Sequence, residues 1–69
     1  MFNQLINSIN NLPSGTNFSI TQDWLNANGI NATANDAISL GKQFAKVYSN
    51  YNCSLVSKGS DNLKMYKKN

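Results

Sequence analysis

Five polar side chains recur on one face of a predicted helix in the middle of the chain. They are Asn35, Ser39, Lys42, Gln43 and Lys46. The amides of Asn and Gln suit the donor and acceptor pair on the edge of adenine, and lysine suits guanine or phosphate. Helical spacing places these groups within reach of one groove of DNA. Because any amphipathic helix in water also has a polar face, the fold around the helix decides between the two interpretations.

The lysines are confined to the second part of the chain. Residues 1–41 contain two Asp and no Lys, a charge of −2, whereas residues 42–69 contain six Lys and one Asp, a charge of +5, which gives the formal net charge of +3. A basic half of this kind indicates a polyanionic partner. The residues expected to contact phosphates or an adjacent minor groove are Lys58, Ser60, Asn62, Lys64, Lys67 and Lys68. Contacts from about five lysines would make log affinity fall with log salt at a slope of roughly −4 to −5.

The sequence provides few groups for catalysis or for binding a metal. The chain has no His, one Cys and three acidic residues, all of them Asp. Each Asp has a local role, in the first turn of a helix (Asp23), near a helix cap (Asp36) or in a hairpin loop (Asp61). Cys53 lacks a histidine to activate it and is assigned to the core as a small hydrophobe. We therefore expect no enzymatic activity, no metal, no cofactor and no small-molecule substrate.

The elements before the polar helix follow from the spacing of apolar residues. Apolar side chains recur at helical spacing from residue 2 and predict a first helix at residues 2–11, which ends before Pro13. A turn follows at residues 12–16. Phe18 and Ile20 then alternate with polar residues, as in a very short strand. A second helix of about two turns has Thr21 as its cap and ends at Asn28-Gly29.

The longest helix is predicted at about residues 34–50. Thr33 and Asp36 have the spacing of a capping box at its start. The apolar positions that are expected to face the core are Ala34, Ala37, Ile38, Leu40, Gly41, Phe44, Ala45, Val47, Tyr48 and Tyr51. Two strands are predicted after it, at residues 53–57 and 63–67, and they are joined by a hairpin loop at residues 58–62.

The predicted order of elements is helix, short strand, helix, helix, strand, strand. This is the order of a winged helix-turn-helix, an α+β fold in which the early strand pairs with a two-stranded C-terminal β-hairpin, the wing. The third helix would then be presented outward. The length of 69 residues allows one domain, which would span residues 1–69.

Two motifs stand out along the chain. Leu12-Pro13-x-Gly15-Thr16-x-Phe18 is followed by Leu40-Gly41-Lys42-x-Phe44 and then by Tyr66 near the end. Together they resemble a small bacterial domain family of unknown function, in which LPxGTxF opens the domain and LGxxF marks its long helix. The resemblance covers most of the chain from residue 12 onward. It implies a shared fold and supplies no catalytic or binding residues.

These observations predict a small winged-helix protein that binds double-stranded DNA. Thirteen Asn, six Lys and no Arg indicate an AT-rich bacterial genome, and the size suits a regulator or accessory factor of a phage, plasmid or other mobile element. Without Arg, a monomer would bind DNA modestly, which favours a homodimer or an array on repeated sites. The pattern contains neither a secretion signal nor a membrane span, so a cytoplasmic protein with no membrane partner is expected.

Two other interpretations stay open. The same fold also serves as a protein-interaction module, here a mobile-element inhibitor or adaptor that docks on a host protein. Weakly charged helix faces rich in Asn suit such docking better than Arg-rich faces would. In the third interpretation, the chain is one protomer of a homo-oligomer whose function the monomer hardly reveals.

Overall fold

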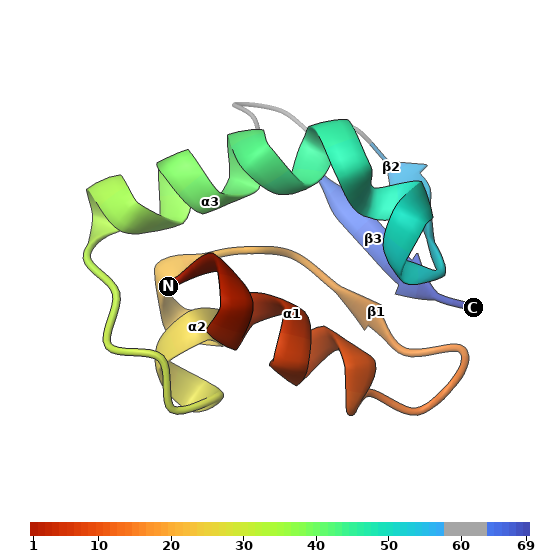
Figure 1. Ribbon diagram of the computed structural model, residues 1–69, viewed down its shortest axis with the longest axis horizontal. Helices are drawn as coiled ribbons and strands as arrows, with labels where there is room; N and C mark the ends of the chain where they lie inside the picture. The colour runs from red at the N-terminus through yellow and green to blue at the C-terminus, as the bar shows by residue number, and fades with distance from the viewer. Residues whose placement is uncertain (58–63) are drawn as a thin grey trace.

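The computed structural model describes residues 1–57 and 64–69, which form three α-helices and a three-stranded antiparallel sheet (Figure 1). The elements in chain order are α1 (Phe2–Asn10), β1 (Asn17–Phe18), α2 (Gln22–Ala27), α3 (Ala34–Val47), the 3₁₀ helix η1 (Tyr48–Tyr51), β2 (Cys53–Ser57) and β3 (Met65–Lys68). The predicted α+β class and order of elements are confirmed. Within the described ranges, none of the helices has the length and apolar character needed to cross a membrane.

β3 is the central strand of the sheet and pairs antiparallel with both neighbours, in the order β1-β3-β2. The early strand therefore joins the C-terminal strands, as predicted. Tyr66 of β3 lies opposite Phe18 of β1 and Leu55 of β2. β3 ends at Lys68, one residue beyond the predicted end. The predicted loop at residues 58–62 and the predicted strand start at residue 63 lie outside the described residues.

The turn after α1 docks against the end of β3. α1 ends at Asn10, within one residue of the prediction. Gly15 has a φ of +88°, a left-handed conformation that costs glycine little because it has no side chain. Its N–H donates to the Lys68 carbonyl at 2.6 Å, and the Lys68 N–H donates to the Thr16 carbonyl at 2.8 Å. The segment around Gly15 is therefore structural, since it extends the pairing of β1 with β3.

Both predicted helix caps are formed. At the start of α2, the Thr21 hydroxyl accepts a hydrogen bond from the Trp24 N–H at 3.1 Å. At the start of α3, the Thr33 hydroxyl accepts from the Asp36 N–H at 3.1 Å, and the Asp36 carboxylate accepts from the Thr33 N–H at 3.0 Å. This capping box satisfies N–H groups that a helix start leaves without partners. It fixes the residue at which α3 begins.

The third helix ends earlier than predicted. Regular α-helix stops at Val47, a 3₁₀ turn continues to Tyr51, and Asn52 follows in the left-handed conformation with a φ of 60°. A 3₁₀ turn places side chains three residues apart on the same side. Tyr48 and Tyr51 are thereby both packed against buried aromatic rings. Tertiary packing of these two tyrosines thus sets the end of the helix.

The core is one cluster with aromatic rings at its centre. Phe18 of β1 stacks with Trp24 of α2 at a ring-centroid distance of 5.4 Å, and Phe44 of α3 lies 6.0 Å from Phe18. The other buried residues are Leu5, Ile9, Ile20, Leu25, Ile30, Ala32, Ala37, Leu40, Cys53 and Tyr66. Every helix and strand named above except η1 contributes at least one buried residue. The burial of Cys53 agrees with its assignment to the core.

Candidate nucleic-acid interface

The five polar side chains predicted to contact DNA lie on the outer face of α3. The inner face of this helix buries Ala37, Leu40 and Phe44. The exposed residues of the outer face include Asn35, Ser39, Lys42, Gln43 and Lys46. α3 crosses one side of the molecule, with α1 and α2 on the other side of the core (Figure 1). The outer face of α3 is therefore accessible to a partner.

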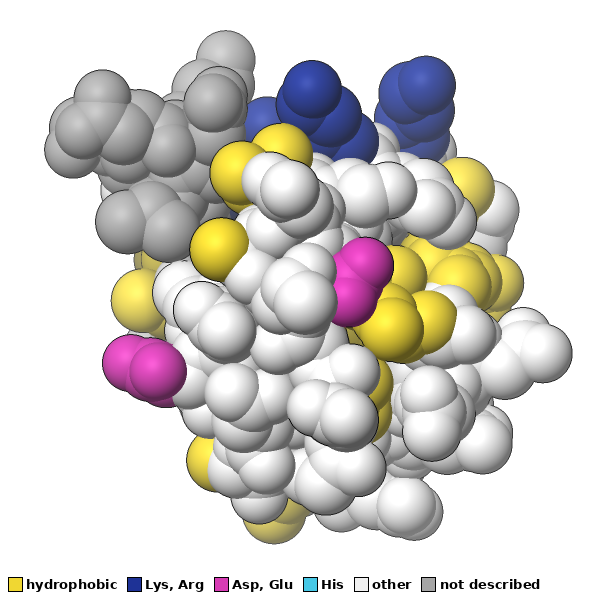
Figure 2. Space-filling view, turned by 90° about the vertical axis from the view of Figure 1, so that its left-hand side faces the viewer, with side chains coloured by type: hydrophobic (Ala, Val, Ile, Leu, Met, Phe, Trp, Pro, Cys, Tyr) yellow, Lys and Arg dark blue, Asp and Glu magenta, His cyan; other side chains and the backbone are white. Residues whose placement is uncertain are grey.

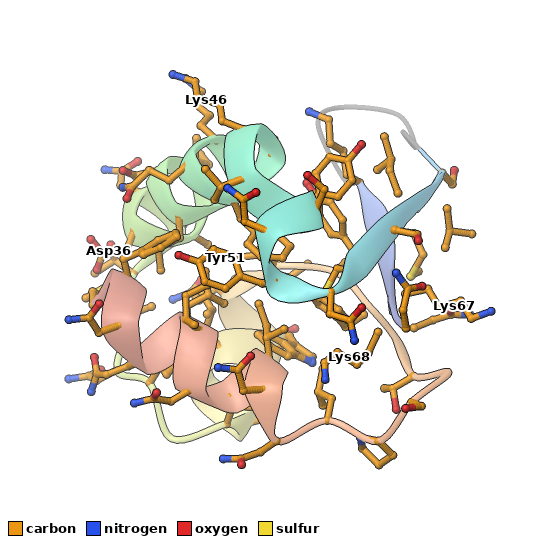
Figure 3. All side chains as sticks on the ribbon, turned by 45° about the vertical axis from the view of Figure 1, so that its right-hand side comes forward. Asp36, Lys46, Tyr51, Lys67 and Lys68 are labelled. Carbon is orange, nitrogen blue, oxygen red and sulfur yellow. The ribbon has the colours of Figure 1, made fainter. Side chains whose placement is uncertain are left out.

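Side-chain contacts within α3 organise part of this face. Gln43 Nε2 donates to the Ser39 hydroxyl, one turn earlier in the helix, at 3.3 Å. This bond engages one of the two amide hydrogens of Gln43. Lys42 and Lys46 are also one turn apart, so they emerge on the same side of the helix. Figure 3 shows Lys46 extending from α3 away from the rest of the molecule.

The two described acidic residues are placed at helix starts. Asp36 closes the capping box of α3, and Asp23 lies in the first turn of α2, where its charge is favourable. In the space-filling view, lysine side chains gather at the top of the molecule, whereas acidic side chains lie lower on the same face (Figure 2). Among the described residues, the cationic part of this face is therefore separate from the carboxylates.

The predicted wing and tail residues fall into three groups. Lys58, Ser60 and Asn62 lie outside the described residues. Lys64, just before β3, is half-buried and borders the same groove as Lys42 of α3. Lys67 and Lys68 lie near the C-terminal end of β3, where Figure 3 shows both well separated from Lys46. A strand rises about 3.3 Å per residue, so the lysines of this one segment reach different ends of the sheet.

A groove of about 320 Å³ lies between α3, the start of α2 and the start of β3. Its lining includes Ile20, Ala34, Ile38, Gly41, Lys42 and Lys64. Helical periodicity predicts Ala34 and Ile38 on the core face, but Ala34 is exposed and Ile38 is 56% exposed. The prediction is wrong because the apolar stripe of α3 is broader than the surface that such short neighbouring elements cover.

The groove is not evident from the sequence, because its walls come from segments far apart in the chain. One local signal for it exists at Gly41. Glycine destabilises the interior of a helix, so a glycine at this position indicates a packing or functional reason for the missing side chain.

Two titratable groups in the core favour their neutral forms. Burial raises the pKa of the Cys53 thiol, an effect that Lys68 opposes without cancelling it. Burial also raises the pKa of the Tyr66 hydroxyl, with further contributions from Tyr48 and Cys53. The Tyr66 hydroxyl has no hydrogen-bond partner among the described residues. A buried, protonated thiol is a poor nucleophile.

Across residues 1–57 and 64–69, no three His, Cys, Asp or Glu side chains are grouped so that they could hold a metal ion.

Comparisons with models of protein families, with curated proteins and with solved structures find no match to this chain. The resemblance to the bacterial family with LPxGTxF and LGxxF motifs therefore stays a prediction. The outer face of α3, its lysines and the adjoining groove are the features from which a function is inferred below.

Proposed function

We propose that the protein is a winged helix-turn-helix domain that binds double-stranded DNA through α3. The order of its elements and the pairing of β1 with β3 support this fold. In a helix-turn-helix the second helix, here α3, lies in the major groove of DNA. The observation that carries the proposal is the outer face of α3, where exposed amides, a hydroxyl and two lysines stand opposite the buried Leu40 and Phe44.

Each exposed side chain on this face has a chemistry suited to DNA. Asn35 and Gln43 offer paired donors and acceptors to adenine, and Ser39 offers a hydroxyl. Lys42 and Lys46 bind phosphates, contacts that supply affinity without sequence information. Arginine is the side chain that most often recognises guanine, and this chain has none. We therefore expect its preferred DNA sites to be rich in A·T pairs.

The described lysines are too widely separated for about five of them, the number predicted from the sequence, to contact phosphates in a complex centred on α3. Lys42 and Lys46 lie on α3 and Lys64 borders the adjoining groove, whereas Lys67 and Lys68 lie near the far end of β3. Three phosphate contacts correspond to a salt slope of about −2.7, weaker than the slope for five contacts. Binding by one protomer is therefore modest, and we include in the proposal a homodimer that doubles the contacts.

A pair of matched double variants tests the proposal. Lys42→Gln with Lys46→Gln removes two charges from α3, and Lys67→Gln with Lys68→Gln removes two from the far end of β3, so both variants have the same net charge. Fluorescence anisotropy measures their binding at low salt to a labelled A·T-rich duplex of about 20 base pairs, two helical turns. The α3 variant should bind at least about tenfold more weakly than the wild type, and the β3 variant less than about threefold. Equal losses would refute a site on α3.

A second candidate function, docking on a host protein, is favoured by the outer face of the sheet. Val56 of β2 is 53% exposed and Met65 of β3 is 36% exposed. Together these two side chains offer a small apolar contact surface to a protein partner. In this alternative, a nuclease-treated lysate yields one stoichiometric partner with the wild type, and Val56→Ser with Met65→Ser loses it. Under the DNA-binding proposal, any co-purification depends on intact DNA.

A further inference from the structure

The groove beside α3 has the size and lining of a small-ligand site. Its volume of about 320 Å³ falls at the lower end of the range of roughly 300–1,000 Å³ that is usual for such pockets. Ile20, Ala34 and Ile38 make much of the lining apolar. Ile20 is buried at the floor, whereas Ile38 is largely exposed and stands at the rim. Burying this rim residue under a ligand would remove apolar surface from water.

Gly41 keeps part of this groove empty. It lies in the interior of α3, where glycine is less stable than alanine. A Cβ atom built on Gly41 would meet no heavy atom of the described residues within 4 Å. Packing within the described part of the protein therefore does not require glycine at this position. Because Gly41 lines the groove, its missing side chain leaves the helix backbone open to close approach by a ligand.

Among the described residues, the charges that line the groove have one sign. They are those of Lys42, from α3, and Lys64, from the segment that enters β3. None of the described lining residues is acidic. The polar group of Gln22 is engaged within the protein, where Nε2 donates to the Ala32 carbonyl at 3.3 Å. The lining therefore complements a ligand that has an apolar body and a negative charge.

We propose that this groove binds a small amphipathic carboxylate, such as a medium-chain or aromatic acid, without converting it. The apolar body lies against Ile20, Ile38 and the open backbone of Gly41, and the carboxylate faces Lys42 and Lys64. This binding does not depend on the DNA-binding proposal. Only its consequence does: because Lys42 and Lys64 belong to both surfaces, an occupied groove would weaken DNA binding.

Octanoate and octanamide form a matched pair of probes, because they have the same chain and differ in charge. Titration of the ¹⁵N-labelled protein, without DNA, should show octanoate shifting the amide signals of Ile20, Ala37 and Gly41. The dissociation constant should be millimolar or below, as expected for a ligand of about ten heavy atoms. Octanamide should bind at least about threefold more weakly, the range of a partly exposed ion pair. Equal binding of both probes, or shifts spread over the whole surface, would overturn the proposal.

Three variants separate the groove from general effects of charge and hydrophobicity. Lys64→Gln should weaken octanoate binding by about threefold, whereas Lys67→Gln, a change of equal charge elsewhere on the same segment, should leave it unchanged. Gly41→Leu should fill the groove and abolish binding while the spectrum stays that of a folded protein, because no described heavy atom lies within 4 Å of a Cβ atom at this position. Retained octanoate binding in folded Gly41→Leu would place the ligand elsewhere and refute the site.

The two proposals fail separately. Octanoate binding in a protein that does not bind DNA would refute the proposed function and leave the groove site standing. DNA binding without octanoate binding would refute the groove site alone. If both occur, octanoate should weaken the DNA complex of the wild type and leave that of Gly41→Leu unchanged.

Discussion

The ring of Tyr66 meets the ring of Phe44 edge to face, with ring centroids 4.9 Å apart and an interplanar angle of 78°. This contact joins the central strand β3 to the inner face of α3. Phe18 of β1 completes the cluster and stacks with Tyr66 at 5.7 Å. Because all three side chains are buried, their packing sets how α3 sits on the sheet. It therefore also sets the direction in which the outer face of α3 points.

Phe44→Ala should be far more damaging than Tyr66→Phe. The first change leaves a cavity and should lower the free energy of unfolding by about 3–5 kcal/mol. The second removes a hydroxyl that has no partner among the described residues, so stability should be unchanged or should rise by up to about 1 kcal/mol. Urea denaturation followed by Trp24 fluorescence measures both. A clear loss of stability in Tyr66→Phe would reveal a hydrogen bond to this hydroxyl in the native protein.

Stability should fall in alkaline solution. Burial raises the pKa of Tyr66 above its ordinary value of 10.0 and the pKa of Cys53 above 9.0. As pH rises, the unfolded chain therefore loses these protons before the native protein does. Their contribution to the free energy of unfolding is complete below about pH 9 and is lost as the pH rises through the native pKa values.

Urea denaturation across this alkaline range measures the effect, with Tyr66→Phe as the comparison. The wild type should lose stability above about pH 9, and the variant should lose less above about pH 10 because one of the two groups is gone. Superimposable pH profiles would mean that Tyr66 ionises as readily in the native protein as in the unfolded chain.

Gly41→Ala should stabilise the protein. The new methyl group meets no described heavy atom within 4 Å, so the usual preference of helices for alanine should appear, about 0.5–1 kcal/mol. For a domain of this size, the midpoint of thermal unfolding should rise by several degrees, at about 4–8 °C per kcal/mol. Circular dichroism during heating measures the shift. A lower midpoint would show that another part of the chain fills the space beside Gly41.

Local signals predict local structure well in this chain. The Thr21 cap and the Thr33–Asp36 capping box depend on hydrogen bonds between residues three apart, so the sequence alone is enough to place the starts of α2 and α3. The end of α3 is different. It depends on Tyr48 and Tyr51 packing against the aromatic core, and no spacing rule indicates where an α-helix changes into a 3₁₀ turn.

The part of the candidate site that depends on local periodicity was predictable, and the part that depends on tertiary packing was not. Periodicity identifies the exposed polar residues of α3, since their exposure follows from the burial of the opposite face. It does not indicate how much of the apolar stripe the neighbouring elements cover, and so it misplaces Ile38. Nor does periodicity indicate which lysines come together, because that depends on which end of β3 lies beside α3. Lys64 and Lys67 are three residues apart, yet only Lys64 borders the groove beside α3.

The salt dependence of DNA binding tests the central proposal most directly. Affinity for an A·T-rich duplex is measured from low to physiological salt for the wild type and for Lys42→Gln with Lys46→Gln. For the wild type, log affinity should fall linearly with log salt at a slope of about −2.7 per protomer, and the variant should lose about two units of that slope. No binding at the lowest salt, or the same slope in both proteins, would contradict DNA recognition through α3.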